Sequence, residues 1–229
     1  TARGRQLVQD CEPLLAGFER ALLAAGDYAG ARGVVRIGAG EIAAASCLPG
    51  FVHAVERDLP GVTLEVELDL TARMLQQVLA GIRDLVLLAG PASSPGLVTA
   101  PIGEVALVWV GSPATAAGGG LARTLPVWSL PPHSPIHEVL RGELANGRIA
   151  AQTVNTCNNV RTMIEVLVGG QGAAVLPETM VRDELARGAL VELAPRPRRA
   201  IRFEAAIRAG EQDPLILELF RRASEMRIG

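Results

Sequence analysis

Short polar residues gather at four turns, each of which follows a run of residues typical of a strand and precedes an expected helix. These turns span residues 38–42, 69–71, 132–134 and 156–159. In open parallel sheets, ligands bind beyond the carboxyl ends of the strands. The first turn of a helix adds backbone N–H groups without partners in the helix, and its dipole favours negative charge. The sequence therefore predicts a cleft that binds a small polar molecule, often a carboxylate.

The residues expected to contact this ligand come from all four turns. Hydroxyl and amide side chains such as Thr71 and Asn158 can also cap their own helices, and capping does not exclude contact with a ligand. The full set of expected ligand-binding residues is Gly40, Glu41, Ile42, Leu70, Thr71, His133, Ser134, His137, Thr156, Cys157 and Asn158.

Glu41 complicates an anion site in this cleft. A carboxylate in the first turn of a helix is stabilised by the helix dipole, and it could occupy the donors that an anionic ligand would use. It would also repel such a ligand. The alternative, a solvated acid on the surface, stays open at this point.

Metal binding and catalysis have weaker support. His133 and His137 lie four residues apart, as two metal ligands on one helix face would, but no third ligand is evident nearby. Cys157 beside a histidine could act as a nucleophile, yet no acid that would orient the histidine and no nucleophile signature surround it. The sequence therefore predicts no metal, no cofactor and no enzymatic activity. Cys11, Cys47 and Cys157 are an odd number of cysteines and cannot form a disulfide framework.

Composition is that of a folded α/β-type protein. The chain has 229 residues, of which 49% are hydrophobic and 20% charged, enough for one large or two small domains. No apolar run reaches the roughly 18 residues of a membrane span, and no signal-peptide pattern is present. All 22 basic residues are arginine, against 24 acidic ones. The net charge of −2 gives no reason to expect this chain alone to bind nucleic acid.

Strands and helices alternate along most of the chain. In the first half, strands at 34–37, 62–68 and 85–89 enclose helices at 44–59 and 71–82, with Thr71 as an expected N-cap. Such βαβαβ order predicts a parallel sheet with helices on its faces. The second half repeats the alternation, with strands expected at 105–110, 126–129, 149–152, 173–176 and 189–193. Asp213 and Pro214 predict the start of a final helix.

The N-terminal helix expected at 3–26 carries one apolar stripe, with Pro13 predicted to kink or interrupt it. The stripe needs a partner, which could be the core of its own domain or a second copy in a dimer. A linker-like stretch at 26–33 favours the dimer. The stripe residues are Leu7, Cys11, Leu14, Phe18, Leu22 and Ala25.

Several segments occur in an order and spacing that resembles the LysR-type transcriptional regulators. They include VVRIGAG at 34–40, LAGIRD at 79–84, VGGQGAAVLP at 168–177 and GALV at 188–191. LPPHSPIH and the triplet CNN look like variants of segments in one branch of that family. Each motif is weak alone, but together they cover essentially the whole chain.

The resemblance implies a fold and a domain organisation. Expected are two Rossmann-like subdomains with a ligand cleft between them, similar to type 2 periplasmic binding proteins. Residues 1–30 would form a linker and dimerisation helix, 33–104 with 208–229 subdomain I, and 105–207 subdomain II. In the family, the inducer contacts the turns that correspond to those described above. Family members commonly have a hydroxyl residue in the first turn, where Gly40 and Glu41 stand here, which argues against an ordinary aromatic-carboxylate inducer.

The implied function is effector sensing in a cytoplasmic DNA-binding regulator. Residues 1–4 look like the end of a winged helix-turn-helix, so a DNA-reading domain is expected upstream. Expected partners are a small-molecule effector, further copies of the chain in a dimer or tetramer, and DNA through that upstream domain, but no membrane. The helices at 44–59 and 214–227 are candidates for the subdomain dimer surface. The alternative is a solute-binding protein of a transport system with the same fold.

Overall fold

The first parallel sheet forms as the alternation of apolar segments predicts. The computed structural model describes residues 1–24, 31–92, 94–226 and 228. Strand β1 lies between β2 and β3 and pairs with both in parallel. Their helices follow in βαβ order, which confirms the predicted crossovers. The elements are β1 (Gly33–Ala39), α2 (Glu41–Ser46), α3 (Leu48–Asp58), β2 (Val62–Leu68), α4 (Thr71–Leu79) and β3 (Leu85–Ala89).

Two local predictions in this part are corrected by the structure. The single helix expected at 44–59 is two helices, α2 and α3, which meet at Cys47. Pro49 stands in the first turn of α3, where its missing N–H is tolerated, whereas inside one continuous helix its ring would clash with the preceding turn. Thr71 is the first residue of α4 rather than its cap, a position that Leu70 occupies.

A second parallel set follows along the chain. Strand β5 pairs in parallel with β6 and β7, and β7 and β8 pair antiparallel with the end of β4. The elements are α5 (Pro113–Ala117), a short 3-10 helix (Gly120–Ala122), β5 (Leu125–Ser129), α6 (Pro135–Ala145), β6 (Ala151–Thr156), α7 (Val160–Gly169), β7 (Ala173–Pro177), α8 (Glu178–Ala186) and β8 (Val191–Leu193).

Two long antiparallel strands connect the two sets. Strand β4 (Leu97–Gly111) pairs with β9 (Ala200–Arg208) along its first ten residues and with β7 along its last five. Strand β9 also pairs antiparallel with β3, so the sheets are mixed rather than purely parallel. The resulting order is β2-β1-β3-β9-β4-β7-β5-β6. The apolar run at 105–110 predicted only the second half of β4, and no pattern in the sequence predicted β9.

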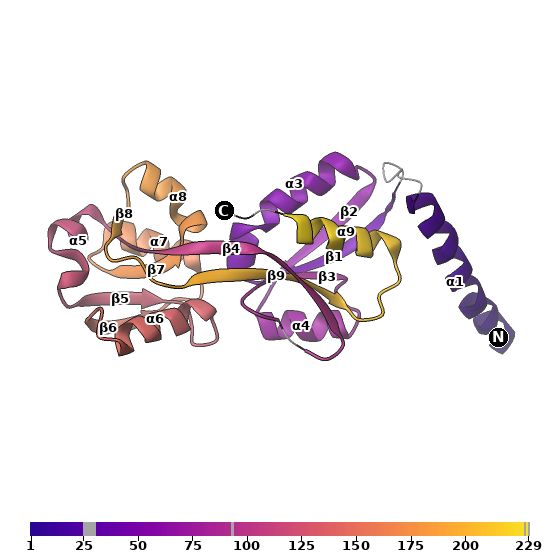
Figure 1. The fold of residues 1–229 in the computed structure, drawn as a ribbon, viewed down its shortest axis with the longest axis horizontal. Helices are drawn as coiled ribbons and strands as arrows, with labels where there is room; N and C mark the ends of the chain where they lie inside the picture. Colours follow the sequence, from indigo (N-terminus) through magenta and orange to yellow (C-terminus); the bar gives the residue numbers. More distant parts are fainter. Residues whose placement is uncertain (25–30, 93, 227, 229) are drawn as a thin grey trace.

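Figure 1 shows two lobes with β4 and β9 running between them. We call lobe I the part with β1–β3, α2–α4 and α9 (Pro214–Glu225), and lobe II the part with β5–β8 and α5–α8. The subdomain boundaries expected at 104/105 and 207/208 fall inside β4 and β9. The division of the chain at those points stays a prediction.

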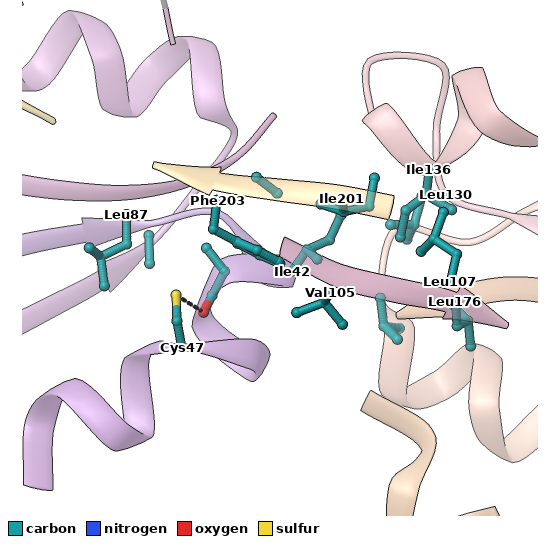
Figure 2. Close-up of a cluster of buried hydrophobic side chains, with 14 of the residues drawn as sticks. Ile42, Cys47, Leu87, Val105, Leu107, Leu130, Ile136, Leu176, Ile201 and Phe203 are labelled. Atoms are coloured by element: carbon teal, nitrogen blue, oxygen red, sulfur yellow. Dashed lines mark hydrogen bonds between the residues drawn. The ribbon is translucent and has the colours of Figure 1, made fainter. Parts of the chain in front are cut away.

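One hydrophobic core continues from lobe I into lobe II through these connecting strands. Val105 and Leu107 on β4 and Ile201 and Phe203 on β9 are at most 3% exposed and belong to the same cluster. The cluster extends on either side, as Figure 2 shows for Ile42, Cys47 and Leu87 in lobe I and Leu130, Ile136 and Leu176 in lobe II. The two lobes are therefore packed together at the crossing strands.

Helix α1 (Ala2–Ala24) projects from lobe I, where it approaches α9 (Figure 1). It continues through Pro13, so the predicted interruption does not occur. Its apolar stripe faces solvent, with Leu7, Leu14 and Phe18 each more than 60% exposed. The side chain of Leu22 and residue 25 lie outside the described part of the chain. None of the described helices is both long and apolar enough to cross a membrane.

Candidate functional site

A cleft of about 400 Å³ lies where turns from the two lobes face each other. Lobe I contributes the turns after β1 and β2, and lobe II contributes the turns after β5 and β6. The lining residues are Gly40, Glu41, Ile42, Leu68, Asp69, Leu70, Thr71, Ala89, Leu130, Pro131, His133, Ser134, Pro135, Asn158 and Asn159.

Backbone hydrogen bonds hold these turns at common sheet edges. In lobe I, Asp69 N–H donates to Ala39 O at 3.2 Å, which fixes the end of β2 beside the end of β1. In lobe II, Cys157 N–H donates to Ser129 O at 2.9 Å, which fixes the end of β6 beside the end of β5. Within each lobe, parallel pairing therefore brings together two turns that lie about 30 positions apart in sequence.

Eight of the eleven expected site residues line this cleft: Gly40, Glu41, Ile42, Leu70, Thr71, His133, Ser134 and Asn158. The other three lie outside its lining. His137 Nδ1 is 3.1 Å from both Ser129 Oγ and Leu130 O, so its ring is held by the end of β5. Thr156 is the exposed last residue of β6, and the Cys157 thiol donates to Asn159 O at 3.3 Å. Contact of any of the eleven with a ligand stays a prediction.

Several residues of the lining were not expected from the sequence. Most of them are apolar residues at strand ends and helix starts, such as Leu68, Ala89 and Leu130, which give no chemical signal in sequence. Asp69 and Asn159 lay within the predicted turns. Their position directly beside the selected residues was the available signal, since the carboxyl end of a strand places several consecutive residues at the sheet edge.

The Glu41 side chain bridges the two lobes. Its Oε1 accepts a hydrogen bond from Val160 N–H, the first amide of α7, at 2.7 Å. The carboxylate therefore occupies a helix-start donor, one of the two alternatives that the sequence left open, although on lobe II rather than on its own helix. Partial burial raises the pKa of Glu41, and the Val160 hydrogen bond opposes this shift.

The helix starts on the lobe II side of the cleft are also capped by the chain itself, whereas α2 and α4 begin without a side-chain cap. Ser134 Oγ accepts from Ile136 N–H at 3.3 Å on α6, and Asn159 Oδ1 accepts from Thr162 N–H at 2.8 Å on α7. Asp69 accepts from Leu70 N–H at 2.7 Å and forms an ion pair with Arg73 at 3.1 Å. Both helix starts on the lobe II side thus carry oxygen acceptors from this chain, while Asp69 binds the amide of the residue before α4.

A second hollow of about 420 Å³ lies at the other end of α2, lined by residues that include Ser46, Thr179 and Arg182. Ser46 Oγ and Thr179 Oγ1 are 3.0 Å apart and form a second link between the lobes. Cys47 also lines this hollow, but its thiol is buried and donates to Ala43 O, and burial raises its pKa to about 12. Within the described residues, no three histidine, cysteine or acidic side chains are grouped to hold a metal ion.

Comparison with known proteins gives one family. Residues 29–227 match the model of the LysR substrate binding domain. A Streptomyces viridosporus protein named "Probable hydrogen peroxide-inducible genes activator" is 30% identical over 204 residues, which are 82% of this chain and 64% of that protein. This chain therefore spans less than two thirds of the length of that relative.

Solved structures agree in fold. The reduced regulatory domain of OxyR2 from Vibrio vulnificus has a TM-score of 0.71 at 18% identity, over 85% of this chain and 95% of that one. Full-length CbnR, solved with its target DNA, has a TM-score of 0.70 at 14% identity, over 97% of this chain and 82% of that one. Both are consistent with the two-subdomain fold similar to type 2 periplasmic binding proteins.

Proposed function

Because this chain belongs to the LysR substrate-binding-domain family, we propose that it senses a small polar effector in the cleft between its two lobes. One observation carries the proposal: turns from both lobes, distant in sequence, line one cleft of about 400 Å³. That volume lies within the range of small-molecule sites.

Binding in this cleft would act on the contacts between the lobes. Helix α2 touches lobe II at both ends, through Glu41 with Val160 and through Ser46 with Thr179. A ligand beside Glu41 can strengthen or replace the first of these contacts. It shifts the arrangement of the lobes only by its difference in affinity between two arrangements, typically about 1–3 kcal/mol.

We propose further that the sensing domain works within a cytoplasmic transcriptional regulator that self-associates and contacts DNA through another part of the protein. The family assignment supports a regulatory rather than an enzymatic role, and we expect no catalytic turnover. It also favours the regulator over the solute-binding protein of a transport system. We base the proposal on the cleft rather than on a thiol, because Cys47 is buried and its pKa is raised to about 12.

A thermal-shift screen of metabolites, followed by a variant that fills the cleft, tests this function. Gly40 has backbone angles open to any residue, and a Cβ added there would meet only Thr71 Oγ1, at 3.5 Å. We expect Gly40→Phe to fold and to lose the rise in melting temperature that an effector gives the native chain. Gly142→Phe is the matched control, because no atom lies within 4 Å of its added Cβ. An effector that stabilises both variants equally would exclude the cleft as its site.

A further inference from the structure

We infer that the cleft selects a ligand that carries a cationic group, such as a primary amine or guanidinium, rather than a carboxylate. This inference rests on the proposed function, because it names the chemical class of the effector for the same cleft. It reverses the expectation from sequence that helix starts at this site would bind an anion.

The charge of the lining is the first observation. Among the described lining residues, Glu41 and Asp69 are acidic and none is an arginine. The chain as a whole contains no lysine, since all 22 of its basic residues are arginine. A cleft lined by charge of one sign concentrates the field and attracts the opposite charge. An anionic ligand would meet the Glu41 carboxylate, and no arginine of the lining offsets its charge.

The second observation concerns the backbone N–H groups at the starts of the helices, most of which already have hydrogen-bond partners on the lobe II side. On the lobe II side, an anion would need free N–H groups at the starts of α6 or α7. Val160 N–H already donates to Glu41, Thr162 N–H to Asn159 and Ile136 N–H to Ser134, at 2.7–3.3 Å. Glu41 and the two caps hold the positions that a ligand carboxylate would take. Lobe II therefore offers the cleft mainly acceptors, while α2 and α4 of lobe I begin without a side-chain cap.

Glu41 is the residue best placed to receive the cationic group. The Val160 hydrogen bond fixes Oε1, and within the described part of the chain no hydrogen bond reaches Oε2. An ammonium has three donors and a guanidinium five, so either could bond Oε2 and neighbouring oxygens such as Thr71 Oγ1. Asp69 contributes less, because Arg73 already pairs with it. Charge-assisted hydrogen bonds of this kind are shorter and stronger than neutral ones.

Three probes with the same four-carbon chain separate charge from shape: putrescine, 1,4-butanediol and succinate. Each is titrated into the ¹⁵N-labelled chain at pH 7.5, and the amide signals of Gly40, Thr71, Asn158 and Val160 report on the cleft. We expect putrescine to shift these signals saturably, at a concentration at least about tenfold lower than either other probe. The Glu41→Gln variant keeps an oxygen that can accept from Val160, and we expect it to bind putrescine about tenfold more weakly.

Glu65→Gln is the control, because it removes an acidic charge from an exposed side chain of β2 that is not part of the lining. We expect it to leave the putrescine titration unchanged. Equal or tighter binding of succinate or butanediol at these amides would overturn the cationic class while leaving the cleft as the effector site. Equal weakening by Glu65→Gln, or no shift of cleft amides by putrescine at 20 mM, would also overturn it. Whether the cleft is the effector site at all is tested separately, by the melting temperature of the Gly40→Phe variant with an effector found by screening.

Discussion

At the scale of single residues, Glu41 lines the cleft, and its partly buried carboxylate lowers the stability of the fold. Its carboxylate is partly buried, which raises its pKa, and a single backbone hydrogen bond from Val160 offsets part of the lost hydration. A buried acid with a perturbed pKa in a cleft is a common feature of functional sites. We interpret Glu41 as a residue kept for binding rather than for folding.

This interpretation predicts a pH-dependent gain from Glu41→Gln. A raised carboxyl pKa means that the folded chain holds the proton more tightly than the unfolded chain. Stability is therefore lost as the pH rises from the ordinary value of 4.5 through the raised pKa. We expect Glu41→Gln to melt at a higher temperature than the native chain at pH 7, and the difference to vanish below pH 4.5.

Calorimetry between pH 4 and 8 measures this difference. Every other residue of the lining is the same in both proteins, so the difference between the two melting curves reports on position 41. A Glu41→Gln variant that is less stable than the native chain at pH 7 would show that the ionised carboxylate stabilises the fold.

At the scale of elements, the two asparagines before α7 have separate roles, one in folding and one in binding. Asn159 caps α7 through its Oδ1, whereas the side chain of its neighbour Asn158 lines the cleft without capping a helix. We expect Asn159→Ala to lower the free energy of unfolding by about 1 kcal/mol, as is typical for the loss of an N-cap. Asn158→Ala should change it by less than about 0.5 kcal/mol.

Urea denaturation of the two variants compares them directly. Equal destabilisation by both substitutions would mean that the cap on α7 does not determine its stability. Retained effector binding in Asn158→Ala, with intact stability, would remove that residue from the predicted contacts.

Most elements of both parallel sets could be predicted because their signals are local, although β6 runs over Ala151–Thr156 rather than 149–152 and no helix was expected at α5. Alternation in β2 and the apolar run of β3 identify strands, and parallel pairing then determines which turns share an edge. Strand β9 and the first half of β4 could not be identified in this way. They mix charged and small residues such as Glu204 and Ala205, and their burial depends on pairing with strands about 100 residues away. The cross-lobe position of Glu41 also depends on this tertiary arrangement.

At the scale of the whole molecule, α1 presents an apolar stripe that the rest of the described chain does not cover. Leu14 is 73% exposed and Phe18 is 64% exposed. Exposed apolar side chains at helical spacing favour pairing with a second helix.

We expect the chain to dimerise through this stripe. The double variant Leu14→Asp with Phe18→Asp should therefore sediment as a monomer at micromolar concentration. Gln9→Asp, on the same helix, is the matched control and should remain a dimer. Sedimentation of the native chain as a monomer, or of both variants as dimers, would contradict a seam at this stripe.

A crystal structure of this chain with an effector found by screening tests most directly whether the cleft between the lobes is the sensing site. We expect the ligand to contact both lobes, within hydrogen-bond distance of Glu41 or Thr71 on one side and of Ser134 or Asn158 on the other. A ligand seated in the hollow at Ser46 and Arg182, or in contact with only one lobe, would contradict this function for the cleft.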